Sequence, residues 1–216
     1  MTLELFLKAL DTISKFIPYL KTFTGERRRD YFDKLLKPLF EAFQDIHEFY
    51  NSLFLETRNK CVALMIENTP LLSSEPELSL EALQKLENIK DEFLQLRTKD
   101  EALRDSLRQD AKEDLQNIKW LEEQRFLVSL IYYFLGIRGI APTENTIDYD
   151  IRAVIEKGGI PHWETPSTRL YLDIRKSYDL NFIIEKLDES RTDLNQKYMN
   201  VRRQFRIVEN TILMKT

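Results

Sequence analysis

The sequence predicts an all-α protein, an elongated antiparallel bundle of a few long helices with coiled-coil-like packing. Only 5 glycines and 7 prolines occur among the 216 residues, so helix-breaking residues are scarce. Apolar residues recur at steps of three and four over long stretches, which is the spacing of a helix face and not of a strand. Charged residues make up 31% of the chain, and the solvated surface that they require suits long helices better than a sphere. We expect residues 1–216 to form a single helical domain.

The first predicted helix runs from about Leu3 to Leu20. Its charged residues form one narrow stripe and nearly all other positions are apolar, so its apolar arc is wider than one buried face requires. We expect Pro18 to kink this helix or to end it. The chain breaks at Gly25, and a second, long helix is predicted from Glu26 to Asn68, bent at Pro38.

A loop and a third helical region follow. Residues 69–79 contain two prolines and three serines, which predicts an exposed loop or hinge. The helical region from Leu80 to Leu135 is not expected to be continuous, because Thr98 and Glu101 have the spacing of a capping box and a helix can restart there. Apolar residues then become sparse, so the segment of about 80–125 is predicted to be an arm of coiled-coil type.

The last third of the chain repeats the helical pattern. The stretch Phe126–Ile137 is apolar all round, as expected of a helix enclosed by others, and it is shorter than the ~20 residues needed to span a bilayer. A short helix is predicted over Glu144–Lys157 and a long final helix over Ser167–Leu213. The final helix keeps an apolar heptad register for over four repeats, interrupted by Arg191 at a core position. Helices of this kind pack side by side and antiparallel.

The composition indicates which cellular compartment and which class of partner to expect. The net charge of −4 provides no global attraction to nucleic acid or to an anionic membrane, so neither is expected as the main partner. Cys61 is the single cysteine, which excludes an internal disulfide and a zinc site of several thiolates. Low cysteine usage and the lack of a signal-peptide pattern favour the cytoplasm.

The usual sequence signatures of catalysis are missing. His47 and His162, the two histidines, are far apart in the sequence and do not form a zinc-protease pair. The sequence contains no nucleophile elbow, no glycine-rich phosphate loop and no dinucleotide fingerprint. We therefore expect no catalytic residue, no metal ion and no cofactor.

Several side chains are candidates for binding a partner. The first helix carries extra aromatic residues along one edge, the loop after Gly158 contains a tryptophan, and two clusters of arginines occur. One cluster lies in the opening turn of a helix, where the macrodipole disfavours each cation by ~0.3–1 kcal/mol, an effect that an Arg29–Asp33 pair can partly offset. The candidate partner-binding residues are Phe16, Tyr19, Phe23, Arg27, Arg28, Arg29, Trp163, Arg202, Arg203 and Arg206.

Each of these candidates has a structural alternative. The aromatic edge of the first helix is equally explained if the apolar stretch Phe126–Ile137 covers it. Trp163 is equally explained as a plug at the end of the bundle, because a large aromatic residue in a helix connector usually belongs to the core. The arginine clusters are equally explained as a solvated face of internally paired charges.

The sequence thus favours a non-enzymatic helical interaction protein, an adaptor or a subunit of a larger complex. Its expected partner is another protein or a second copy of the chain. The alternative is a hydrolase acting on nucleic acid or a nucleotide, with a site that is assembled only in three dimensions near the 139–166 connectors. Asp148, Asp150 and Glu164 would be its active residues. Attachment to a membrane surface through residues 1–23 is disfavoured, because the lysine-rich flanks that it requires are only modestly present.

Overall fold

A computed structural model describes residues 3–22, 28–68, 78–135, 147 and 164–214, and every structural statement below concerns these residues. About nine in ten of them are helical and none of them lies in a strand, which confirms the predicted all-α class. The elements are α1 (Leu3–Thr22), α2 (Arg28–Tyr31), a π-helical turn (Phe32–Leu36), α3 (Lys37–Asn68), α4 (Leu80–Asn117), α5 (Leu121–Leu135), α7 (Pro166–Ile174) and α8 (Leu180–Leu213).

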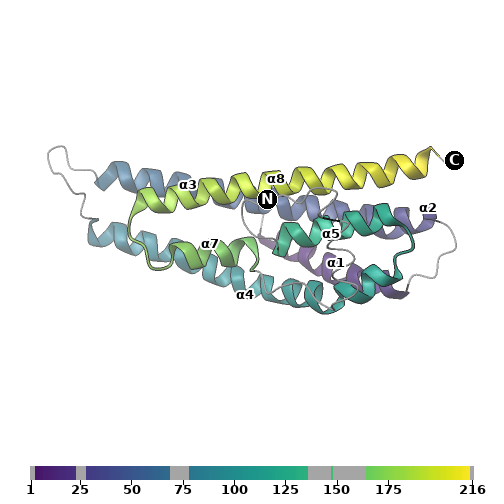
Figure 1. The fold of residues 1–216 in the computed structure, drawn as a ribbon. Helices are drawn as coiled ribbons and strands as arrows, with labels where there is room; N and C mark the ends of the chain where they lie inside the picture. Colours follow the sequence, from purple (N-terminus) through teal and green to yellow (C-terminus); the bar gives the residue numbers. More distant parts are fainter. Residues whose placement is uncertain (1–2, 23–27, 69–77, 136–146, 148–163, 215–216) are drawn as a thin grey trace.

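The described helices form an elongated bundle, as predicted (Figure 1). α3 and α8 lie side by side along one long edge, and α4 runs along the opposite edge, where it packs against α1 and α7. α5 packs mainly against α8. The 34 residues of α8 span ~51 Å at 1.5 Å per residue, so this helix alone covers most of the length of the bundle.

Stacked rings fix the alignment of α3 with α8. The ring of Phe40 stacks on that of Phe205 with 4.0 Å between centroids, and His47 stacks on Tyr198 at 3.9 Å. Because later residues of α3 meet earlier residues of α8, the two helices are antiparallel. The heptad positions of α8 face inward as predicted, and at the predicted interruption Arg191 is half-buried and donates a hydrogen bond from Nε to Asn51 Oδ1 at 3.2 Å.

The second predicted helix is continuous from Arg28 to Asn68, and the structure adds a cause for its irregularity. A π-helical turn, Phe32–Leu36, comes just before Pro38, and the backbone N–H of Lys37 bonds to the carbonyl of Phe32. Proline cannot donate to the carbonyl four residues earlier and its ring clashes with it, so a wider turn before the proline relieves both problems. In α1, by contrast, the helix continues past Pro18 to Thr22.

The predicted helix restart at Thr98 is wrong. α4 is unbroken from Leu80 to Asn117, and the Thr98 hydroxyl donates to the carbonyl of Leu94 within the helix instead of capping a new one. The discontinuity that the sequence suggested lies later, at residues 118–120, before α5 begins. The predicted enclosure of α5 is confirmed, since nearly all its residues from Phe126 to Leu135 are buried. The arm proposed for 80–125 stays a prediction, although α4 packs against other helices.

The prediction of one final helix from Ser167 to Leu213 is also wrong. Residues 175–179 separate α7 from α8. Asp179 caps α8, because its Oδ1 accepts hydrogen bonds from the backbone N–H groups of Asn181 and Phe182. Thr165 and Pro166 begin α7 as N-cap and first helical residue. Apart from Ile147, the predicted short helix 144–157 lies outside the described residues, and so does most of the loop 69–79.

Candidate functional site

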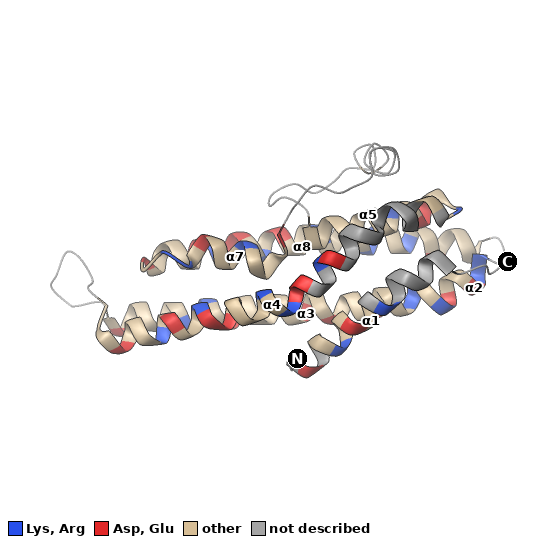
Figure 2. Ribbon diagram, turned by 90° about the horizontal axis from the view of Figure 1, so that it is seen from below, with Lys and Arg blue, Asp and Glu red and all other residues tan. Residues whose placement is uncertain are grey.

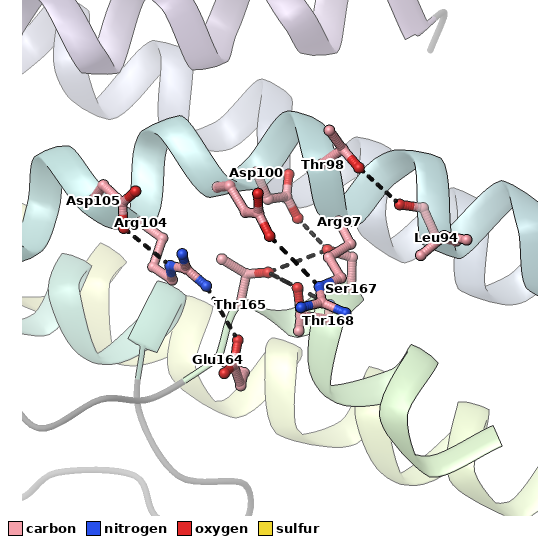
Figure 3. A network of polar contacts seen from close by, with 11 residues as sticks. Leu94, Arg97, Thr98, Asp100, Arg104, Asp105, Glu164, Thr165, Ser167 and Thr168 are labelled. Carbon is pink, nitrogen blue, oxygen red and sulfur yellow. Dashed lines mark hydrogen bonds and ion pairs between the residues drawn. The ribbon is translucent and has the colours of Figure 1, made fainter. Parts of the chain in front are cut away.

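A buried carboxylate joins three helices that are far apart in the sequence. Asp100 lies in α4 and its side chain is entirely buried. Its Oδ2 accepts a hydrogen bond from the Tyr50 hydroxyl of α3 at 2.7 Å. It accepts another from the Ser167 hydroxyl of α7 (Figure 3). Tyr50 and Ser167 are fully buried too. These three residues form the Asp100 cluster.

The start of α7 suits a buried anion. The Thr165 side chain accepts a hydrogen bond from the backbone N–H of Thr168, which fixes the first turn of the helix beside Asp100 (Figure 3). The positive end of the α7 dipole therefore lies near the carboxylate and stabilises its charge. Burial nevertheless raises the pKa of Asp100 to about 6, while the hydrogen bonds from Ser167 and Tyr50 act in the opposite direction.

The Asp100 cluster holds helices together instead of exposing a reactive group. A serine hydroxyl bonded to a carboxylate has the residue types of a nucleophile and its base. A base must reach the proton of a bound substrate, whereas Asp100 and Ser167 are both completely covered by protein. The chemistry available to this cluster in the described structure is therefore the fixing of α7 and α3 on α4.

A second polar contact ties the start of α7 to α4. Arg104 Nη1 lies 3.5 Å from Glu164 Oε2, and Arg104 Nε donates to Asp105 at 3.2 Å (Figure 3). Glu164 is one of the three acidic residues that the hydrolase alternative requires. It is half-buried and paired with this arginine, while Asp148 and Asp150 lie outside the described residues.

Three other buried titratable groups also have partners. His47 Nδ1 lies 3.1 Å from the Tyr133 hydroxyl, and burial lowers the pKa of His47 to about 4. Lys197 and Asp193, one turn apart in α8, form a buried ion pair at 2.8 Å. Among the described residues, no group of three or more His, Cys, Asp or Glu side chains is arranged to hold a metal ion.

Arg28 has a partner within the chain that the sequence did not reveal. Its guanidinium donates to both carboxylate oxygens of Glu123 at 2.6 and 2.7 Å and to Glu122 at 2.8 Å. It also lies 5.4 Å from the centre of the Trp120 ring. Glu123 is fully buried at the start of α5, so Arg28 connects α2 to α5, and the hydrogen bonds that Arg28 donates to Glu123 raise the pKa of Arg28.

The remaining candidates of the first helix and its connector are only partly described. The predicted Arg29–Asp33 pair is confirmed, with Arg29 Nε 3.7 Å from the carboxylate. Phe16 and Tyr19 lie in α1, but the structure describes their backbone alone. Phe23, Arg27 and Trp163 lie outside the described residues. Whether these residues bind a partner stays a prediction.

The second arginine cluster lies on a surface that we call the outer face. The outer face consists of Lys37, Glu41, Asp45 and Glu48 on α3 and of Gln196, Met199, Arg202, Arg203, Arg206 and Asn210 on α8. All are exposed except Arg202, which is half-buried. Apart from Lys37, charges are segregated here, with three acidic residues on α3 and three arginines on α8. Along α4, by contrast, basic and acidic residues are interspersed (Figure 2).

Comparison of the chain with protein-family models, with curated proteins and with solved structures finds no match. The function is therefore inferred from the geometry of the chain itself. Within the described residues, no helix combines the length and the apolar character that crossing a membrane requires.

Proposed function

We propose that this protein is a non-enzymatic helical interaction protein, an adaptor or a subunit of a larger complex, and that it binds protein through the outer face. The outer face is the observation that carries this proposal. Its charged residues lie at steps of three and four, so they project from the same side of each helix. The ring stacks of Phe40 on Phe205 and of His47 on Tyr198 hold the two helices rigidly beneath it, and a rigid surface binds with little loss of conformational freedom.

The internal polar groups support the same proposal. Asp100, Ser167 and His47 would be the natural candidates for acid–base chemistry, yet all three are buried and bonded within the bundle. They specify how the helices pack. The inward heptad register of α8 against α3 supports packing of the coiled-coil type, which is common among proteins that assemble through helices.

The single cysteine supports a cytoplasmic location for this activity. Cys61 is fully buried in α3, and burial raises the pKa of its thiol to about 11. The thiol is therefore protonated at neutral pH and resists oxidation, because the thiolate is the reactive form. A chain with a single cysteine, buried and protonated, forms no internal disulfide. Its stability therefore does not depend on an oxidising compartment.

Affinity capture from the native cell tests the proposal. The baits are the wild-type protein, the variant Arg202→Glu with Arg206→Glu, and a control, Arg175→Glu with Lys176→Glu, which makes the same change of charge in the exposed turn between α7 and α8. The wild type and the control should both retain at least one protein that the outer-face variant loses. An untagged copy of the chain itself counts as such a protein. If all three baits retain the same proteins in equal amounts, the outer face does not bind a partner.

A further inference from the structure

The two charged stripes of the outer face overlap in height along the bundle. Phe40 meets Phe205 and His47 meets Tyr198, so the segment 40–47 of α3 runs beside the segment 198–205 of α8 in the opposite direction. The acidic stripe, Glu41, Asp45 and Glu48, falls within or next to the first segment. The arginines at 202 and 206 fall within or next to the second. Glu41 therefore lies at a height between Arg202 and Arg206, and Asp45 and Glu48 follow along α3 at the heights of residues 200 and 197.

This arrangement is self-complementary under one particular symmetry. A two-fold axis that lies in the plane of the outer face and runs parallel to the helices places α3 of one copy over α8 of the other, without a shift along the helices. The acidic stripe of each copy then faces the arginines of its partner, and both contacts form together, as an isologous interface requires. A two-fold axis across the helices would place α3 over α3 and acidic stripe over acidic stripe.

We propose that the partner bound at the outer face is a second copy of this chain, docked about the two-fold axis parallel to α3 and α8. This inference rests on the proposed function and specifies its partner. Charge complementarity is its main support, because apposed charges of opposite sign select a partner and its register. Met199, 58% exposed between the arginines and Gln196, supplies an apolar contact near the middle of the interface.

Charges beyond the two stripes limit the extent of the interface. Lys37 of α3 lies at the height of Glu209 of α8, so the complementarity continues by one turn towards the C-terminal end of α8. In the other direction both helices expose acidic residues, Glu56 on α3 and Glu185 on α8. The contact therefore covers about half the length of the helices, and its strength depends on exposed charges that salt screens.

Reciprocal charge reversal tests the dimer. One variant reverses the basic stripe (Arg202→Glu with Arg206→Glu) and the other reverses the acidic stripe (Glu41→Lys with Asp45→Lys). The wild type and the Arg175→Glu, Lys176→Glu control should sediment at twice the monomer mass in low salt, and each stripe variant should dissociate about tenfold or more readily. An equimolar mixture of the two stripe variants should restore a dimer, because the acidic α8 of one meets the basic α3 of the other. Urea unfolding midpoints close to that of the wild type would show that both variants are folded.

The outcomes separate this inference from the proposed function. A monomeric wild type in low salt, at about 100 µM protein, overturns the dimer, since the screening length is then at its longest. If that monomer still captures another protein that the Arg202→Glu, Arg206→Glu bait loses, the proposed function stands with a different partner. A dimer that both stripe variants retain places the contact elsewhere and overturns the inference. Dimers from the mixture but not from either variant alone support it.

Discussion

Replacing Arg28 by alanine removes a buried contact whose partner cannot compensate. The guanidinium, 16% exposed, makes two hydrogen bonds to Glu123, and the Glu123 side chain is completely buried. In the variant this carboxylate keeps its place at the start of α5 without the cation that neutralises it. The neighbouring Arg29 provides a matched control, because its 3.7 Å contact with Asp33 joins two side chains that are both more than half exposed.

The magnitudes expected for Arg28 and Arg29 differ widely. Breaking a buried ion pair by removing one member costs ~3–5 kcal/mol, because a buried charge is left uncompensated. We expect the lower end, about 3 kcal/mol, since the Arg28 side chain reaches the surface and its removal lets water approach. The exposed Arg29–Asp33 pair is worth about 0.5 kcal/mol. A loss of 3 kcal/mol is large against a total stability of ~5–15 kcal/mol.

Urea unfolding followed by circular dichroism measures this difference. Arg28→Ala should lower the midpoint by about 1 M at an m-value of roughly 2–3 kcal/mol/M, while Arg29→Ala should leave it nearly unchanged. The double variant Arg28→Met with Glu123→Leu should recover most of the loss, because an apolar pair replaces the ion pair without leaving a charge behind. Equal midpoints for Arg28→Ala and Arg29→Ala would refute the reasoning.

Three further predictions follow from buried groups. Phe205→Ala should cost about 3–5 kcal/mol in urea unfolding, because the ring stacks on Phe40 at 4.0 Å in the core, and a loss below about 1 kcal/mol would contradict this packing. Burial raises the pKa of Asp100 from 3.8 to about 6, so its protonation favours the folded state and this contribution is lost as pH rises through 6. Asp100→Asn should therefore gain roughly 3 kcal/mol relative to the wild type between about pH 4 and pH 7, and a constant difference across that range would show that Asp100 is not buried. His47, whose pKa is lowered to about 4, acts in the opposite direction in both proteins, so the difference isolates Asp100. Cys61, fully buried with a thiol pKa of about 11, should react with a thiol reagent only after unfolding, and rapid reaction of the native protein would disprove its burial.

The parts of the fold that depend on residues close together in the sequence could be predicted from it. The inward face of α8 follows from apolar residues at heptad spacing, and the Arg29–Asp33 pair follows from two opposite charges one helical turn apart. The division of the last helix was also predictable in principle. Thr165 followed by Pro166 is a helix start, and Asp179 before an apolar run is another. The apolar periodicity of this segment does not reveal these caps, because it marks buried positions and not helix ends.

The Asp100 cluster and the Arg28–Glu123 contact could not be predicted in this way. Asp100 stands in the charged run LRTKDEALRD, where nothing distinguishes it from Lys99 or Glu101. It is buried because α3 and α7, both distant from it in the sequence, pack around it. Arg28 and Glu123 are likewise brought together by tertiary packing across 95 positions. A periodicity argument treats such charges as solvated surface, because charged side chains are rarely fully buried.

Ser167 of α7 and Tyr50 of α3 donate to the same oxygen, Asp100 Oδ2. This shared contact stabilises α7, which could not persist alone. A helix of nine residues is too short to persist in water by itself. Detaching it from α4 would break the hydrogen bond from the Ser167 hydroxyl to Asp100 Oδ2, and the same oxygen orients Tyr50 of α3. Local opening of α7 therefore breaks the contact of Ser167 with Asp100 and also disturbs that of Tyr50. The amide hydrogens of α7 should exchange with solvent only when the surrounding part of α3 and α4 opens as one cooperative unit. The nine residues of α7 should therefore show hydrogen-exchange protection similar to that of α4, which has 38 residues.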